Sequence, residues 1–260
     1  MFQVLPDAPL IVAANRDERV DRPAVPVTVL RDRDPRILGG RDELAGGTWL
    51  AVNEHGVVAG LTNQPSPDGR DPTKRSRGEL PLAFAKHRTA KEAVATVSAE
   101  LDPAAYNACW MLVGDRESLF FIGISSGSTM DLEQLGPGLH ILENAPLKPV
   151  SPKAAFVRGL VTDAAAASAG NAAATVSALR TVLGDHRPAV PEPRTDAFGR
   201  VWPPAVTAAC VHVDGYGTRS AMIVSVPGVA DAPAVMVADG KPCEEPMYDA
   251  TALWVEAPPL

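Results

Sequence analysis

Long apolar runs, clustered cysteines and clustered basic residues are all scarce in this sequence of 260 residues. No segment approaches the ~18 consecutive apolar residues of a membrane-spanning helix. The N-terminus also lacks the basic start and long apolar stretch of a signal peptide. The formal net charge is -7, whereas nucleic-acid binding needs clustered Lys and Arg. The sequence therefore predicts a cytoplasmic protein with no membrane span and no nucleic-acid partner.

Cysteine and histidine are both few and scattered. The three cysteines, Cys109, Cys210 and Cys243, form no Cys-x-x-Cys pair and no disulfide framework, so a reducing compartment is expected. The histidines show no metal-ligand spacing, and each is expected to be a surface residue or a hydrogen-bonded core residue. We therefore predict no metal and no cofactor. The histidines are His55, His87, His140, His186 and His212.

The composition is that of an ordinary globular protein, with 46% hydrophobic and 21% charged residues. The length is ample for a buried core. No internal repeat and no clear domain boundary interrupt the chain, so residues 1–260 are expected to form a single domain. The proline-rich segment 185–205 is the best candidate for a surface connection or an insertion.

Apolar patterning predicts strands, then a helix, then strands, then helices, then strands. A helix is expected from Thr89, an N-cap with Glu92 three residues later, to about Leu101. Two more helices are expected within 152–184, broken near Gly170 and Asn171. This order lacks regular strand–helix alternation and favours antiparallel sheets with helices on their outer faces, an α+β fold. The expected strands are 10–15, 49–52, 57–62, 109–113, 119–122, 130–135, 138–142, 208–213, 218–226, 235–237 and 253–255, with a short first arm at 2–5.

Two motifs suggest chemistry but lack the right context. Residues 123–127 match the Gly-x-Ser-x-Gly nucleophile elbow around Ser125, which needs a helix directly afterwards, and strand-like sequence follows instead. The glycine pairs at 39–40 and 46–47 precede no helix and carry no Gly-Lys-Ser/Thr ending, so tight turns are expected there.

Polar residues at the ends of strands form a more informative pattern. Arg16 and Asp17 follow the apolar run that begins at Leu10, and amides and another arginine end other strands. Such groups can form an oxyanion hole and stabilise a nucleophile. Taken singly, each is more typical of a turn residue or a strand cap than of a catalytic site. The full set is Arg16, Asp17, Asn63, Asn144 and Arg219.

Several short fragments together resemble the NRDE-motif family, also called the transport and Golgi organisation protein 2 family. The resemblance covers nearly the whole chain. That family is similar to N-terminal-nucleophile hydrolases, which implies a four-layer α-β-β-α sandwich of antiparallel sheets. The fragments are 13–18, 22–23, 40–42, 45–50, 52–53 with Gly56, 61–63, 76–78 and 216–220.

The resemblance also implies roles for the strand-end residues. Arg16 and Asp17 match the pair that orients a cysteine nucleophile and its amine. Asn63 and Asn144 match the two oxyanion-hole positions, and Arg219 matches the arginine that supports the cysteine. In that machinery an N-terminal thiol attacks an amide carbonyl while its own α-amine serves as the base, because the pKa of that amine lies near neutrality.

The sequence departs from the family at the nucleophile. Members carry Cys after the initiator Met, but this chain reads Met1-Phe2 and has no cysteine before Cys109. One explanation is a natural start further upstream, which the short arm at 2–5 favours, since strands usually span about 5–6 residues. The other is a non-catalytic member that retains the pocket.

Three functions are therefore considered. The first is an amidohydrolase acting on a carbon–nitrogen bond in a small acyl amide, inactive in the chain as written. The second is a non-catalytic carrier of haem, lipid or acyl-coenzyme A, ligands proposed for the family. The third is a serine hydrolase using Ser125. The first two require a small-molecule ligand or substrate held in a cleft.

Overall fold

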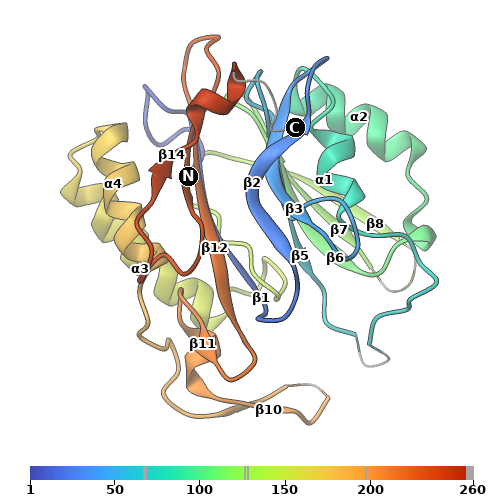
Figure 1. Cartoon of the computed structure of the whole chain (residues 1–260), viewed down its shortest axis with the longest axis vertical. Helices are drawn as coiled ribbons and strands as arrows, with labels where there is room; N and C mark the ends of the chain where they lie inside the picture. Colours follow the sequence, from blue (N-terminus) through green and yellow to red (C-terminus); the bar gives the residue numbers. More distant parts are fainter. Residues whose placement is uncertain (67–68, 126, 128, 197, 256–260) are drawn as a thin grey trace.

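The fold was examined in a computed structural model, which describes residues 1–66, 69–125, 127, 129–196 and 198–255. Two antiparallel sheets face each other, and two helices cover the outer face of each (Figure 1). The order of the layers is α3 and α4, first sheet, second sheet, α1 and α2. This is the predicted four-layer α+β sandwich.

The first sheet has the order β1-β12-β13-β14, and β11 pairs with β12 as well. The second sheet follows the chain from β2 to β8, each strand beside the next. A separate small hairpin, β9 with β10, lies within the proline-rich segment 185–205. The strands are β1 (Leu10–Arg19), β2 (Ala24–Arg31), β3 (Ile37–Asp42), β4 (Leu50–Asn53), β5 (Val58–Asn63), β6 (Cys109–Gly114), β7 (Leu119–Ile124), β8 (Met130–Leu135), β9 (Arg194–Thr195), β10 (Val201–Trp202), β11 (His212–Val213), β12 (Tyr216–Val226), β13 (Ala234–Ala238) and β14 (Tyr248–Asp249).

Strand β1 is apolar on both faces because each face enters a different core. Leu10 belongs to the cluster between the two sheets. Its neighbour Ile11 belongs to the cluster between the first sheet and the α3–α4 pair. Side chains alternate along a strand, so even-numbered residues of β1 face the second sheet and odd-numbered ones face the helices. A continuous apolar run is the expected sequence of such a doubly covered strand.

The helices begin at the residues that the sequence marks as caps. The Thr89 hydroxyl accepts a hydrogen bond from the Glu92 backbone N–H at 3.1 Å, and the Asn171 side chain caps α4 in the same way through Ala174 N–H at 2.8 Å. The predicted break near 170–171 is confirmed, with Gly170 at φ +78°. The helices are α1 (Glu79–Phe84), α2 (Ala90–Glu100), α3 (Pro152–Ala167) and α4 (Ala172–Leu183), with 3-10 turns η1 (Pro103–Ala105), η2 (Pro204–Thr207) and η3 (Thr251–Trp254).

Some predicted elements are wrong. Residues 138–142 form no strand; Gly138 instead makes a single bridge to Phe2, and Phe2 also bridges Leu10, so the predicted first arm is reduced to isolated pairs. Residues 253–254 fall in η3, where the Trp254 indole N–H donates to Pro233 O at 2.7 Å. Strand β2 was not predicted. It contains Pro26, and a proline is tolerated there because β2 is an edge strand.

The glycine pair at 39–40 also differs from prediction. It lies inside β3 rather than in a tight turn. A Cβ on Gly40 would lie 2.0 Å from Cζ2 of Trp49, so the missing side chain leaves room for the indole ring. Glycine within a strand often marks such a close approach.

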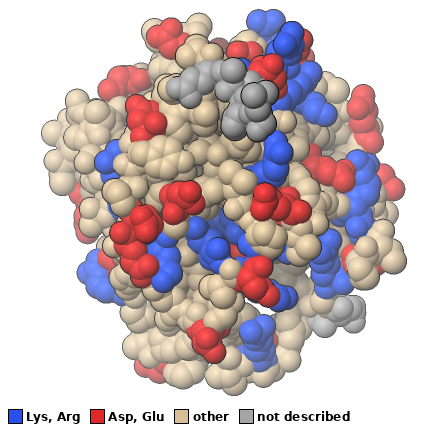
Figure 2. Space-filling model, in the orientation of Figure 1, with Lys and Arg blue, Asp and Glu red and all other residues tan. Residues whose placement is uncertain are grey.

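The surface does not have a single sign of charge. Acidic and basic side chains are interspersed over the described residues of the face in Figure 2. None of the helices described is both long and apolar enough to cross a membrane.

Candidate functional site

A cavity of about 870 Å³ extends along β1 from Leu10 to Glu18. Its walls come from β1, the second sheet, the segment 139–144, both helices α3 and α4, and the segment 194–211. This volume is typical of small-molecule sites. Four of the five predicted site residues line it: Arg16, Asp17, Asn63 and Asn144.

Arg16 points from β1 toward the second sheet. Its guanidinium carbon lies 4.5 Å from the centre of the Trp49 ring, a cation–π contact. The residue is 8% exposed, and burial lowers the pKa of the guanidinium from its ordinary value, although arginine stays charged in proteins. Within the described part of the chain its side chain makes no hydrogen bond and no ion pair within 4 Å. The carboxylates of Glu18 and Asp42 are near enough to raise the pKa of Arg16, against the larger effect of burial. Arg16 is therefore a buried cation at the cavity whose direct contact is with an aromatic ring.

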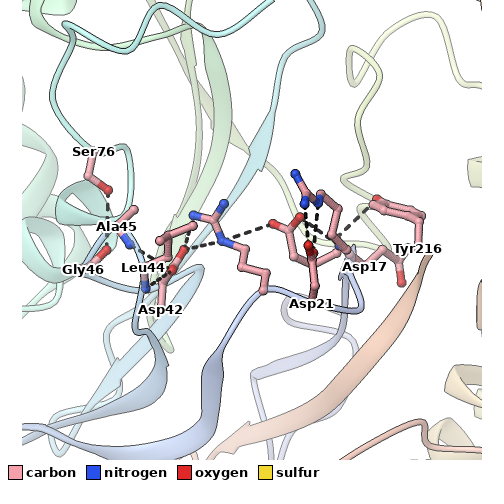
Figure 3. A network of polar contacts seen from close by, with 11 residues as sticks. Asp17, Asp21, Asp42, Leu44, Ala45, Gly46, Ser76 and Tyr216 are labelled. Carbon is pink, nitrogen blue, oxygen red and sulfur yellow. Dashed lines mark hydrogen bonds and ion pairs between the residues drawn. The ribbon is translucent and has the colours of Figure 1, made fainter.

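Asp17 points the other way, toward α3. One carboxylate oxygen accepts a 2.6 Å hydrogen bond from the Thr218 hydroxyl, and the other lies 3.7 Å from Nζ of Lys153. The Tyr216 hydroxyl donates to the Asp17 backbone carbonyl at 3.3 Å (Figure 3). Burial raises the pKa of Tyr216, so this phenol stays protonated. Asp17 is thus held in place by its neighbours.

Asn63 and Asn144 lie on two segments that are joined directly. The hydroxyl of Thr62 donates a 2.9 Å hydrogen bond to the backbone carbonyl of Glu143, next to Asn144. Both asparagines are exposed, and within the described residues neither side-chain amide has a hydrogen-bond partner. Two free amides therefore lie on neighbouring segments of the cavity wall.

Arg219 does not line the cavity. Along the β1–β12 pair, Arg16 lies opposite Ser220 and Asp17 opposite Thr218, so Arg219 is the extra residue of a β-bulge. Its guanidinium donates to the backbone carbonyl of Val20 at the end of β1. It still contributes positive charge near Arg16 and lowers the pKa of Arg16. The bulge explains why sequence position alone could not place this side chain.

A polar network holds the loop after β3 beside β1 (Figure 3). Arg22 donates to one carboxylate oxygen of Asp42 at 2.6 and 3.0 Å. The other Asp42 oxygen accepts from the backbone N–H groups of Leu44 and Ala45. Burial by itself would raise the pKa of Asp42, but these hydrogen bonds outweigh it and the net pKa is lowered.

Gly47 and Gly78 meet at the back of this loop. Gly47 has φ +80°, and a Cβ there would lie 2.4 Å from the carbonyl of Gly78. The backbone N–H of Thr48 donates to that same carbonyl at 2.9 Å. The fragments 45–50 and 76–78 therefore contact each other, which requires glycine on both sides.

Asn15 has a structural role beside the cavity. Its amide donates to the backbone carbonyls of Leu183, at the end of α4, and of Ala209, before β11, at 2.9 and 2.8 Å. One side chain of β1 thus joins two segments far apart in sequence. The sequence did not single out Asn15, Trp49 or Lys153, because their roles depend on contacts from distant elements.

Ser125 lies outside the cavity. It occupies the turn between β7 and β8, where its hydroxyl pairs with that of Thr129 at 2.7 Å, and a strand follows instead of a helix. None of the three cysteines lines the cavity either.

Comparison with known proteins identifies the relationship. The family described as Transport and Golgi organisation 2 matches residues 1–231. The chain belongs to the Transport and Golgi organisation 2 family. The family resemblance predicted from the short fragments is therefore confirmed.

Curated members of the Transport and Golgi organisation 2 family match over most of their length. The homolog from Mus musculus is 31% identical over 229 residues, which cover 84% of this chain and 82% of the relative. The human homolog is 30% identical over 231 residues with the same coverage. The homolog from Bos taurus is 29% identical over 231 residues, again with 84% and 82% covered.

Solved structures establish the fold class of this family member. Penicillin V acylase from Agrobacterium tumefaciens aligns with a TM-score of 0.54 at 13% identity, covering 93% of this chain and 82% of that chain. A mutant conjugated bile acid hydrolase from Clostridium perfringens aligns with a TM-score of 0.50 at 9% identity, covering 95% and 91%. At such identities the similarity shows the fold alone. The fold is N-terminal-nucleophile-hydrolase-like, as predicted.

Proposed function

We propose that the cavity binds a small acyl amide that carries a negative charge, and that the reaction class of the site is hydrolysis of the carbon–nitrogen bond. The observation that carries the proposal is Arg16, a buried cation at the cavity wall that makes no direct ion pair in the described part of the chain, although the carboxylates of Glu18 and Asp42 lie nearby. A buried charge is normally paired, so an anionic group of the ligand is its natural counterpart. Arginine suits a carboxylate because its planar fork donates two parallel hydrogen bonds.

The other walls supply what an acyl amide needs. The free amides of Asn63 and Asn144 can donate to an amide oxygen, and donors of this kind stabilise the oxyanion that develops during acyl transfer. The apolar walls accept an acyl chain, since burial contributes about 25 cal/mol per Å² of apolar surface. These apolar residues include Leu10, Val12, Leu50, Leu112 and Leu119.

Hydrolysis in this scheme requires a thiol. The thiolate attacks the carbonyl carbon, the carbon–nitrogen bond breaks, and the leaving amine takes a proton from the α-ammonium group. Water then hydrolyses the thioester and returns the thiol. Because no cysteine of this chain lines the cavity, we expect the chain as given to bind the ligand without turning it over.

The binding proposal is tested with Arg16→Gln. Calorimetric titration with N-acyl amino acids, and with the same compounds capped as neutral amides, measures the contribution of the charge. We expect wild type to prefer the anionic ligands, and the variant to bind them roughly 10–100-fold more weakly, since a charge-assisted hydrogen bond contributes about 1.5–3 kcal/mol. Arg33→Gln, whose parent side chain is 82% exposed, is the matched control. Equal affinity in wild type and Arg16→Gln would reject the role of Arg16.

The reaction class is tested with an N-terminal extension. Phe2 lies opposite Leu10, and the Met1 amine donates to Ile11 O at 2.8 Å. Continuing this antiparallel pairing, about five added residues would bring the first one beside Arg16. An extended form that begins with cysteine after removal of the initiator methionine should hydrolyse acyl amides, and one beginning with alanine should not. If the cysteine form binds acyl amides without hydrolysing them, the proposed hydrolysis is rejected and a carrier function remains.

A second candidate, haem carriage, is favoured by His140. This residue lines the cavity, and burial lowers the pKa of its imidazole, which keeps the ring neutral as a haem ligand must be. Its Nε2 is paired with Gly136 O at 2.9 Å, which leaves Nδ1 as the ligating atom. Haem titration followed by absorbance should show a Soret shift that His140→Ala abolishes. An unchanged titration in the variant would exclude His140 as the ligand.

A further inference from the structure

Outside the cavity, four potential metal ligands from distant parts of the chain converge. The ligating atoms of His186, Cys210, His212 and Cys243 all lie within 4.8 Å of one another. His186 follows α4, Cys210 precedes β11, His212 lies in β11, and Cys243 follows β13. The four residues line a pocket of about 460 Å³ together with Ala205 and Glu244.

The spacing of three of these atoms, those of Cys210, His212 and Cys243, is that of a tetrahedral site, and the ligating atom of His186 lies within 4.8 Å of each of them. Zinc binds thiolate sulfur at about 2.3 Å and imidazole nitrogen at about 2.0–2.1 Å, which in a tetrahedron places two sulfurs about 3.8 Å apart and a sulfur and a nitrogen about 3.5–3.6 Å apart. The Sγ atoms of Cys210 and Cys243 are 3.7 Å apart. Nε2 of His212 lies 3.5 Å from the first sulfur and 3.4 Å from the second.

The surroundings complete the site. Nδ1 of His212 lies 3.9 Å from a carboxylate oxygen of Glu244, and metal-bound histidines commonly pair their other nitrogen with a carboxylate. The His186 ring stands edge-on to that of His212, with centroids 4.6 Å apart. The backbone N–H of Cys210 donates to Asp185 O at 2.8 Å, which joins the segments that carry His186 and Cys210.

We infer that His186, Cys210, His212 and Cys243 form a Cys₂His₂ site for a soft divalent cation, zinc by the chemistry of its ligands. Four protein ligands leave no open coordination position, so the site is structural. Binding releases the protons of both thiols, since thiolates are the ligands. The prediction of no metal rested on the scattered histidines and on the absence of a Cys-x-x-Cys pair, whereas this site combines the two residue types across three segments.

The site supports one wall of the large cavity. Leu183, Ala209 and Val211, which adjoin the ligand-bearing segments, line that cavity. Asn15 of β1 holds Leu183 and Ala209 from the other side. A cation would therefore fix the end of α4 and the start of β11 against β1.

The test uses the full, untagged chain, reduced and stripped of metal. Titration with Co²⁺ should give visible bands and thiolate-to-cobalt charge transfer that saturate at one equivalent, and Zn²⁺ should displace the cobalt. Cys243→Ser should lose the charge-transfer intensity of one thiolate and bind Zn²⁺ at least about 100-fold more weakly. Because Cys243 is exposed, this substitution leaves the core intact. Glu244→Gln should weaken Zn²⁺ binding about 10-fold through His212.

Two controls and one alternative make the test decisive. Cys109→Ala and His55→Ala remove the same types of ligand elsewhere and should leave one tight equivalent bound. Circular dichroism confirms that each variant is folded. If the reduced wild type has free thiols and binds neither Co²⁺ nor Zn²⁺, the inference is overturned. If mass spectrometry instead finds a Cys210–Cys243 disulfide that persists after reductant treatment, it is overturned as well.

Discussion

Arg16 and Asp17 are neighbours on β1, yet their side chains enter different surroundings. Asp17 faces α3, and its two carboxylate oxygens are occupied by Thr218 of β12 and Lys153 of α3. Arg16 faces the second sheet, where its guanidinium contacts the Trp49 ring and makes no direct ion pair. Groups whose hydrogen bonds are satisfied within the protein stabilise it, whereas a buried charge without a partner costs stability and is retained for binding. The contacts of Asp17 therefore stabilise the wall of the cavity, whereas the guanidinium of Arg16 remains available to bind a ligand.

The largest expected effect lies in the loop that frames the Arg16 side. Gly47→Ala places a Cβ against the Gly78 carbonyl at a positive φ. We expect the free energy of unfolding to fall by about 3 kcal/mol or more, measured by urea denaturation. Gly46→Ala, at φ +69° with nothing within 4 Å, is the matched control and should cost only about 1 kcal/mol. Equal costs would show that the contact with Gly78 is unimportant.

Thr218→Val tests the structural side directly. It removes the donor to Asp17 and the acceptor of the Val211 backbone N–H, which bonds the Thr218 hydroxyl at 2.9 Å. Because Val is nearly isosteric and both partners lose a buried hydrogen bond, we expect a loss of about 2 kcal/mol in the free energy of unfolding. Thermal and urea unfolding measure it. Thr73→Val, in an exposed loop, should change stability little.

Arg16→Gln tests the opposite side by the same measurement. The contact with Trp49 and the attraction of Glu18 and Asp42 are lost, and the cost of burying the cation disappears with them. The free energy of unfolding should therefore change by less than about 1 kcal/mol. Ligand affinity falls instead. A loss of stability larger than that of Thr218→Val would reverse the assignment of the two sides.

The smallest effect concerns acid stability. The folded-state pKa of Asp42 is lowered, despite burial, by hydrogen bonds from Arg22, Ala45 and Leu44. A depressed carboxyl pKa stabilises the fold above the unfolded pKa, and this contribution is lost as the pH falls through the folded pKa. The stability difference between wild type and Asp42→Asn should therefore be largest above about pH 4 and shrink below it. Urea titrations at several pH values measure the difference, and a constant one would contradict the linkage.

Local signals in the sequence predicted local structure well. The Thr89 N-cap, the break at Gly170 and the apolar run of β1 each depend on neighbours a few positions away, so the sequence alone revealed them. The reciprocal bond of the predicted capping box differs, because the Glu92 carboxylate accepts from the Arg88 backbone N–H at 3.1 Å. The two cores entered by Leu10 and Ile11 could be expected only as a buried strand, because the partners come from distant elements.

Features that depend on contacts between residues far apart in the sequence could not be predicted from local patterns. Phe2 pairs with Gly138, which removes both predicted strands around them. Arg219 does not join the other four predicted site residues at the cavity, because it is the extra residue of a bulge in β12. The Cys₂His₂ cluster draws ligands from three segments, at His186, at Cys210 with His212, and at Cys243. No ligand-spacing rule for zinc sites spans the separations between these segments.

Because β1 packs against the second sheet on one face and against α3 and α4 on the other, its alignment with β12 cannot shift by one residue without misplacing its side chains. A shift of one position along β12 would send every side chain of β1 to the opposite face. The guanidinium now beside Trp49 would then turn toward α3, and the carboxylate would turn toward the second sheet. Insertions in the loop at 3–9 leave this pairing unchanged. A single residue inserted between Leu10 and Arg16 without a compensating bulge would instead move Arg16 and Asp17 to opposite faces of the sheet from those they now occupy. Whether a residue of β1 has an even or an odd number therefore decides which side of the sheet its side chain faces, and so which groups line each part of the cavity.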